Sequence, residues 1–303
     1  MSLDIGDAAA LLDSFLLHLR AERKSPQTVK TYGDGIRLFL RWCEAEICTD
    51  GADFALDRPT VDKWIASLLD GGAEPATARS RQLAVRRFSA WLAAEGEIPA
   101  DELARMSPPK LDAKAVDPLS DEQLVSMLAA CKGPELRDKR DEAIIRLMVE
   151  TGARAGEILA LQMADVDLAA GMAVIHRGKG GKGRRVPFGP RTGAAVDRYI
   201  RARRRHRLAA TPALWLGTAG RGFAYHGLRD TLAYRAQRAG ISGFYLHRLR
   251  HTAAHRWLAA GGSEGGLMAV AGWTRPDMLQ RYTRARASER AAEEARRLNL
   301  GDL

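Results

Sequence analysis

Two short segments near the end of the sequence combine side chains that can do chemistry together. One reads His-Arg-Leu-Arg-His over residues 247–251, and the other reads Gln-Arg-Tyr over residues 280–282. An arginine presents a planar fork of donors that matches phosphate oxygens. A histidine can carry a proton near neutral pH, and a tyrosine hydroxyl can form a covalent ester with phosphorus. These segments therefore predict chemistry on a phosphodiester.

Two earlier segments carry charged groups that could serve the same chemistry. The run Thr-Gly-Ala-Arg-Ala-Gly-Glu at 151–157 puts Arg154 at a turn ahead of a helix, with Glu157 one helical turn on to orient it. Taken alone, it is better explained as an exposed salt bridge. The glycine-rich run 178–183 carries Lys179 and Lys182 but lacks the Gly-Lys-Ser/Thr ending of a nucleotide-binding loop. It can be a solvated turn, or a tip whose lysine enters a minor groove or protonates a leaving oxygen.

A metal site is the alternative for the histidines, because His247, His251 and His255 recur at helical spacing. No carboxylate or thiol completes a ligand set, and Arg250 would lie on the face of His247, where it would repel a cation. We therefore expect no metal, and we expect His251 and His255 to be packing residues. Packing is also the simplest role for Trp273 taken alone.

Residues 1–106 predict a small helical bundle. Apolar residues at helical spacing, with Ser25 and Pro26 as a start signal, predict helices over 8–20, from 26 onward, over 59–69 and over 75–94. The expected core positions of the last helix are Leu83, Val85, Phe88, Trp91 and Leu92.

Residues 107–118 are rich in proline and polar residues and predict a linker. Beyond it, Ser120 and Gln123 form the pattern of a capping box for a helix that runs to about residue 131. A helix over 137–150 should end at Gly152, and a short one should cover 157–161. Residues 173–176 and 185–188 predict two strands of a hairpin around the glycine-rich run, and helices dominate from 191 onward. The fold class is thus mainly α, with a small antiparallel sheet in the second domain.

The positive charge of the chain is concentrated in its second part. The chain has 47 Lys and Arg, 37 Asp and Glu, and a formal net charge of +10. Residues 1–110 carry 14 basic and 17 acidic residues, which leaves 33 and 20 for residues 111–303. A basic domain attracts polyanions and releases their counterions on binding. Nucleic acid is therefore the expected partner.

Cysteine content and hydropathy point to a cytoplasmic protein. The three cysteines at 43, 48 and 131 match no tight metal spacing and are expected to be reduced thiols. The start of the sequence has no basic segment followed by an apolar run, and no stretch approaches the length of a membrane span. We expect no role for a membrane.

Together the segments resemble the tyrosine recombinase (phage integrase) family. The resemblance is carried by Thr-Gly-Ala-Arg-Ala-Gly-Glu around Arg154, Gly-Lys-Gly-Gly-Lys-Gly-Arg around Lys179, His-Arg-Leu-Arg-His from His247, Ala-Gly-Trp at 271–273 and Tyr-Thr-Arg from Tyr282. Their order and spacing both match. The likeness covers both domains and is greatest to Xer-like and simple integrases without an arm-binding domain. It implies a SAM-like helical core-binding domain at 1–106, a linker at 107–118, an α+β catalytic domain at 119–284, and an exchange tail at 285–303.

The resemblance also implies a role for each matching residue. Tyr282 would attack the scissile phosphate and form a 3′-phosphotyrosyl enzyme, while Arg154 and Arg250 would bind the non-bridging oxygens. His247 would assist proton removal, and Lys179 would be the general acid for the departing 5′-oxygen. Neither a metal nor a nucleotide cofactor is implied.

Position 273 departs from many family members, which have histidine there. The indole of Trp273 can donate a hydrogen bond but cannot transfer a proton near neutrality. Acid or base work by this residue is thereby excluded, while hydrogen bonding and packing remain open to it.

The implied partner is a double-stranded DNA core site, clamped by both domains. The resemblance suggests a set of contact residues, each of which could equally lie on a solvated face: Lys24, Thr28, Lys30, Arg79, Arg86, Arg87, Lys182 and Arg184. The arginine-rich run 201–207 is a further candidate for phosphate contact. The tail would link four protomers in a synapse, and a second recombinase or accessory protein could take part.

Two other functions stay open at this point. A type IB topoisomerase uses a similar set of residues to nick and reseal one strand. A non-catalytic DNA-binding regulator on the same scaffold is the second alternative, although binding alone does not need a phenol beside the phosphate.

Overall fold

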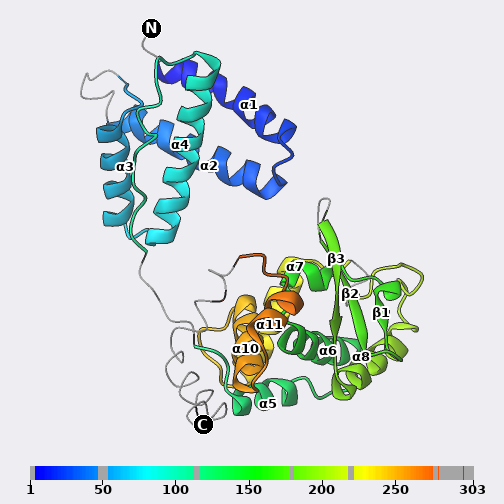
Figure 1. Ribbon diagram of the computed structural model, residues 1–303. Helices are drawn as coiled ribbons and strands as arrows, with labels where there is room; N and C mark the ends of the chain where they lie inside the picture. Colours follow the sequence, from blue (N-terminus) through cyan, green and yellow to red (C-terminus); the bar gives the residue numbers. More distant parts are fainter. Residues whose placement is uncertain are drawn as a thin grey trace, which may run out of the picture. The chain divides into compact units, whose positions relative to one another are not determined.

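The computed structural model describes residues 4–46, 54–111, 117–177, 181–217 and 222–275, with single positions at 279 and 296. The chain divides into two compact units, residues 1–114 and 115–303, each with its own core (Figure 1). The division falls within residues 107–118. The fold is mostly helical with a small antiparallel sheet, as the sequence predicts.

The first unit is a bundle of helices: α1 (Ile5–Ala21), α2 (Pro26–Glu46), α3 (Arg58–Asp70) and α4 (Pro75–Glu95). Its core gathers aromatic rings, and Phe39 lies 5.0 Å from Trp64 between ring centroids. The predicted helices are all present within a few residues. The expected core position Leu83 is wrong, because its side chain is 40% exposed. The apolar face of α4 passes through Val85, Phe88 and Leu92 instead.

The second unit contains more helices and the sheet. Its elements are α5 (Asp121–Ala129), α6 (Leu136–Thr151), α7 (Ala155–Leu159), η2 (Met163–Asp165), β1 (Val166–Asp167), β2 (Met172–Arg177), β3 (Gly181–Pro187), α8 (Pro190–Arg203), α9 (Tyr225–Arg238), α10 (Leu246–Ala259) and α11 (Glu264–Ala271). The strands pair antiparallel in the order β1-β2-β3. The strand β1 was not predicted.

The helix α6 lies at the centre of this unit. It packs against α7, α8, α9 and α10, while α11 contacts α10 and β3 (Figure 1). Local signals in the sequence set helix ends here: the predicted capping box of Ser120 and Gln123 opens the preceding helix α5. Gly152 ends α6 in the left-handed conformation, with φ at +61°. The end of α6 is therefore fixed just ahead of the Arg154 segment.

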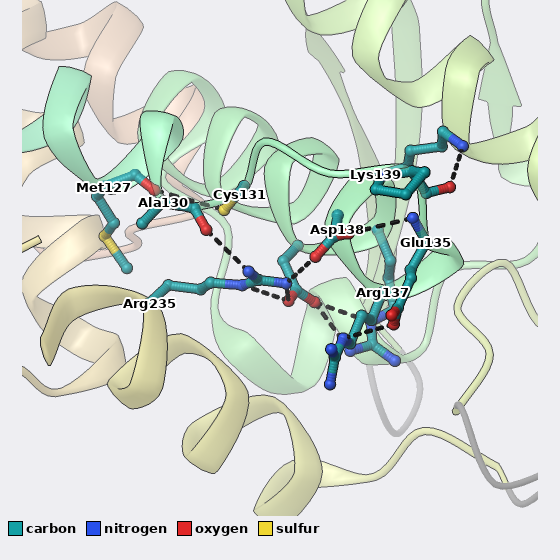
Figure 2. Close-up of polar contacts among 11 residues, drawn as sticks. Met127, Ala130, Cys131, Glu135, Arg137, Asp138, Lys139 and Arg235 are labelled. Carbon is teal, nitrogen blue, oxygen red and sulfur yellow. Dashed lines mark hydrogen bonds and ion pairs between the residues drawn. The ribbon is translucent and has the colours of Figure 1, made fainter. Parts of the chain in front are cut away.

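A buried ionic network holds α6 to its neighbours (Figure 2). Arg235 of α9 donates to Asp138 at 2.7 Å, to Asp141 at 2.9 Å and to the carbonyl of Ala130 at 2.8 Å. Arg140 donates to Asp141 and to the carbonyl of Leu216. Buried charges of this kind require partners, and here two arginines meet two carboxylates. The network ties α5, α6, α9 and the segment at 216 together.

Cys43 and Cys131 are buried, and burial raises the pKa of the Cys131 thiol to about 12. Within the described residues, no group of three or more His, Cys, Asp or Glu side chains is arranged to hold a metal ion. Among those same residues, no helix has both the length and the apolar composition needed to cross a bilayer.

Candidate active site

Arg154 stands at the junction between α6 and α7. The chain leaves α6 through Gly152, and Arg154 then takes the extended conformation of an N-cap residue, with φ −70° and ψ 151°. Its side chain is 45% exposed. The backbone of Arg154 is thus fixed at the start of α7, while nearly half of its side-chain surface stays open to solvent and could meet a phosphate.

Glu157 anchors Arg154 from one turn further along α7. Its carboxylate accepts the backbone N–H of Arg154 at 2.8 Å and the Nη1 of the same residue at 3.0 Å. Burial disfavours the charged form of this carboxyl. Hydrogen bonds from Arg184 and from the backbone of Arg154, together with their positive charges, nevertheless lower the pKa of Glu157 to about 2. Glu157 is therefore a fixed negative charge at neutral pH.

Arg250 lies on the first turns of α10 with its side chain buried, only 1% of the residue being exposed. Its Nη1 donates to the carbonyl of Gly152 and its Nη2 to the carbonyl of Ala271 at 2.8 Å. It therefore ties the end of α6 to the end of α11. Both partners are neutral carbonyls, and the guanidinium lies in a buried position, where electrostatic effects are strong.

The ring of His247 lies one turn before Arg250. It meets the ring of His251 edge to face, with centroids 4.8 Å apart. His251 and His255 are partly buried on α10. His251 thus supports the imidazole of His247 by ring packing.

A cavity of about 200 Å³ brings the three predicted residues Arg154, His247 and Arg250 together. Its wall also includes Tyr225 at the start of α9, which is 51% exposed. Tyr225 was not predicted from the sequence, because a lone tyrosine at a helix start carries no motif. The volume suits a group of phosphate size, and two guanidinium groups line it.

Trp273 follows the left-handed Gly272 that ends α11. It is 5% exposed and packs with Ala254, Leu258 and Leu267. Its ring centroid lies 5.2 Å from the guanidinium carbon of Arg250. Trp273 therefore supports Arg250 from behind by a cation–π contact.

Two predicted residues are not described, and a third is described only in its backbone. Lys179 and Tyr282 lie outside the described residues. Lys182 belongs to β3, but its side chain is not among those described.

Arg184 of β3 is held within the fold by its hydrogen bonds. Its side chain is 14% exposed, and all three of its guanidinium nitrogens donate to protein groups. The donors of this arginine are used within the fold, and its predicted DNA contact stays a prediction.

The first unit carries its predicted contact residues on α2, on α4 and on the turn before α2. Lys30, Arg79 and Arg87 are exposed. The Nζ of Lys24 lies 3.5 Å from Oε2 of Glu22. The hydroxyl of Thr28 is 2.7 Å from that of Ser25. A groove of about 530 Å³ runs between these helices, lined by Thr31, Asp34, Gly35, Leu38, Arg41, Ala76, Thr77, Ser80 and Arg81.

Two other arginines have structural partners that the sequence did not indicate. Arg86 donates to the carbonyls of Leu103 and Ala104 at 3.1 and 3.0 Å. Arg203, in the arginine-rich run, is 4% exposed and donates to four carbonyls between residues 209 and 214. Arg203 is therefore unavailable for the suggested phosphate contact.

Comparison with known families matches nearly the whole chain. Residues 118–289 match the phage integrase family, and residues 12–96 match the N-terminal SAM-like domain of phage integrases. A tyrosine recombinase XerC from Azotobacter vinelandii is 33% identical over 213 residues, which are 69% of each chain. A tyrosine recombinase XerC from Corynebacterium glutamicum is 29% identical over 76% of this chain and 73% of its own.

Solved structures share the fold at lower identity. The XerH site-specific recombinase bound to a palindromic difH substrate superposes with a TM-score of 0.73 at 16% identity, over 96% of this chain and 84% of the other. A lambda integrase dimer bound to a core site gives a TM-score of 0.71 at 16% identity, over 90% of this chain and 76% of the other.

Proposed function

The chain belongs to the phage integrase family as a tyrosine-type site-specific DNA recombinase, and we propose that the cavity at Arg154, His247 and Arg250 is where it cuts and rejoins DNA. One observation carries this assignment. Residues almost a hundred positions apart in the sequence, Arg154 and Arg250, converge on one cavity of phosphate size together with an imidazole. A fold that only bound DNA would not need this convergence.

In the proposed reaction the Tyr282 oxygen attacks the scissile phosphorus and the bond to the 5′-oxygen breaks. The products are a 3′-phosphotyrosyl bond and a 5′-hydroxyl, which takes its proton from Lys179. Attack by the 5′-hydroxyl of another strand reverses the step and releases the tyrosine. The energy of the broken bond is conserved, so the scheme needs no nucleotide.

Arg154 and Arg250 bind the non-bridging oxygens and stabilise the charge of the pentacoordinate transition state. The exposed tip of Arg154 suits it to meet the phosphate, and the buried charge of Arg250 strengthens the field there. His247 hydrogen-bonds the phosphate and assists proton removal from Tyr282. Trp273 donates a hydrogen bond or packs, but transfers no proton.

DNA binding by the first unit is proposed to use the exposed face of α2 and α4. Lys24, Lys30, Arg79 and Arg87 supply positive charge beside the groove between these helices. We further propose that residues 285–303 link protomers in a tetrameric synapse, since one of the structural neighbours is a lambda integrase tetramer bound to a Holliday junction.

The test is incubation with a nicked duplex that carries a candidate core site, followed by denaturing gel electrophoresis. The expected result is a covalent protein–DNA adduct that Tyr282→Phe abolishes. Arg154→Ala should slow its formation about 10²- to 10³-fold. Absence of an adduct on sites that the protein binds tightly would refute the proposal. Adding a second duplex then separates strand exchange from relaxation of one strand.

A further inference from the structure

Arg184 joins three parts of the site. From β3 it donates Nη1 and Nη2 to the two oxygens of Glu157, at 3.1 and 2.7 Å. Its Nε donates to the carbonyl of Val270 at 2.6 Å. It thus connects the strand that follows the Lys179 hairpin with α7, which carries Arg154, and with the end of α11, which leads to Trp273.

The guanidinium of Arg184 is tightly packed. Gly272 has φ at +66°, and a Cβ there would lie 2.8 Å from Nη1 of Arg184. Any side chain at that position would push against the guanidinium. A glycine that turns the chain toward Trp273 therefore also makes room for Arg184.

The arrangement explains how Arg154 keeps its tip exposed. Glu157 is shared by two arginines, and Arg184 takes it with both terminal nitrogens in a bidentate pair. Arg154 is left with a single side-chain bond, through Nη1 at 3.0 Å. If Arg184 were absent, Glu157 would be free to bind Arg154 with both oxygens and draw its guanidinium away from the cavity.

We propose that Arg184 is a positioning residue: by holding Glu157 in a bidentate pair it sets the guanidinium of Arg154 for the phosphate and couples that setting to the hairpin of Lys179. The inference rests on the proposed function, in which Arg154 binds the scissile phosphate. In this proposal Arg184 acts through Glu157 and not by contact with the substrate. Misplacing a catalytic group by about 1 Å can cost roughly 10²-fold in rate, which sets the scale of the expected effect.

The test compares single-turnover cleavage of the nicked substrate by the full chain and its variants. Arg184→Gln should slow cleavage about 10- to 100-fold while the affinity for the core site stays within about twofold. Arg184→Lys, which keeps the charge but not the fork, should be intermediate. In the Glu157→Gln background, Arg184→Gln should add nothing further, because it acts through Glu157.

The pH dependence of the cleavage rate is a second measurement, and it would not change if Arg184 had only a structural role. Arg184 is the largest group lowering the pKa of Glu157. In Arg184→Gln that pKa rises, so the variant should lose a larger fraction of its cleavage rate than the wild type when the pH is lowered from 7 toward 5.

The matched control is Arg198→Gln. Arg198 also donates to a glutamate shared with a second arginine, binding Glu142 at 2.9 and 3.0 Å beside Arg146, but it lies outside the cavity lining. This variant should cleave like the wild type even if it is slightly less stable.

The outcomes separate the two proposals. If wild-type protein forms the Tyr282-dependent adduct and Arg184→Gln forms it equally fast, the positioning role is refuted. Additive losses in the double variant, or unfolding of Arg184→Gln in thermal melts to a degree that explains its loss, would also overturn it. If the wild type forms no adduct on tightly bound sites, the proposed function fails, and this inference fails with it.

Discussion

Removing the charge of Asp141 should strongly destabilise the second unit. Its side chain is 1% exposed. One of its oxygens accepts from Arg140 at 3.0 and 2.8 Å, and the other accepts from Arg235 at 2.9 Å. Asp141→Asn would turn one acceptor into a donor that faces a guanidinium, and would strand positive charge in the core.

The magnitude follows from the burial of the network. Breaking a buried ion pair from one side costs about 3–5 kcal/mol. For a folding unit of about 190 residues, each kcal/mol lowers Tm by about 2–4 °C, so the transition should fall by about 6–20 °C. Burial raises the pKa of Asp141 although both arginines oppose that rise, so its desolvation outweighs the attraction of its partners. The stability lost in Asp141→Asn therefore reflects the cost of leaving Arg140 and Arg235 buried without a carboxylate more than the strength of the ion pair.

Calorimetry of the full chain measures this effect, with chemical unfolding as a second method. The matched control is Asp197→Asn in the same unit. Asp197 pairs with Arg201 at 2.9 Å, but the two side chains are 46% and 62% exposed. The control should change stability by no more than about 0.5 kcal/mol.

A double variant tests the physical reason. In the Asp141→Asn background, Arg140→Met removes one of the stranded charges and should recover part of the lost stability. The reasoning is refuted if Asp141→Asn has the same Tm as the Asp197→Asn control. It is also refuted if the loss in the free energy of unfolding of the double variant equals the sum of the losses of the two single variants.

Four further variants probe the site. Glu157 has its pKa lowered from 4.5 to about 2, so its charged form stabilises the fold by about 3 kcal/mol above pH 5, and this contribution is lost as the pH falls from about 4.5 toward 2. In urea unfolding, Glu157→Gln should cost more stability at pH 7 than at pH 3, and equal costs would contradict the assigned cause. Gly272→Ala, at φ +66° and against Arg184, should cost about 1–3 kcal/mol in thermal melts, and a neutral change would show that the guanidinium is not tightly seated. Trp273→Phe should keep partial cleavage and Tyr282→Phe none, so equal loss in the adduct assay would count against the assigned roles.

Local signals allowed the helices and their ends to be predicted from the sequence. The capping box of Ser120 and Gln123 and the left-handed Gly152 depend only on residues a few positions apart, and both are present. The strand β1 was missed because two residues show no alternation. Leu83 was misassigned because apolar character alone does not say which side of a long helix faces the core.

The convergence of Arg154, His247 and Arg250 was predictable only through the family resemblance, since helical spacing does not bring residues almost a hundred positions apart together. Tyr225 lines the same cavity, although no sequence motif predicts its position there. Its position depends on how α9 packs against α7, which is a tertiary property.

The arginines show why a basic sequence does not by itself map a DNA-binding surface. Arg86 and Arg203 use their donors on backbone carbonyls, and Arg184 uses two of its three on Glu157. Each looks like a phosphate contact by residue type alone. A donor that already holds the fold cannot move to a phosphate without leaving a buried acceptor unsatisfied, which costs about 1–3 kcal/mol. Loss of DNA binding on replacing such an arginine therefore reports on the fold, whereas loss on replacing exposed Lys30, Arg79 or Arg87 reports on the contact.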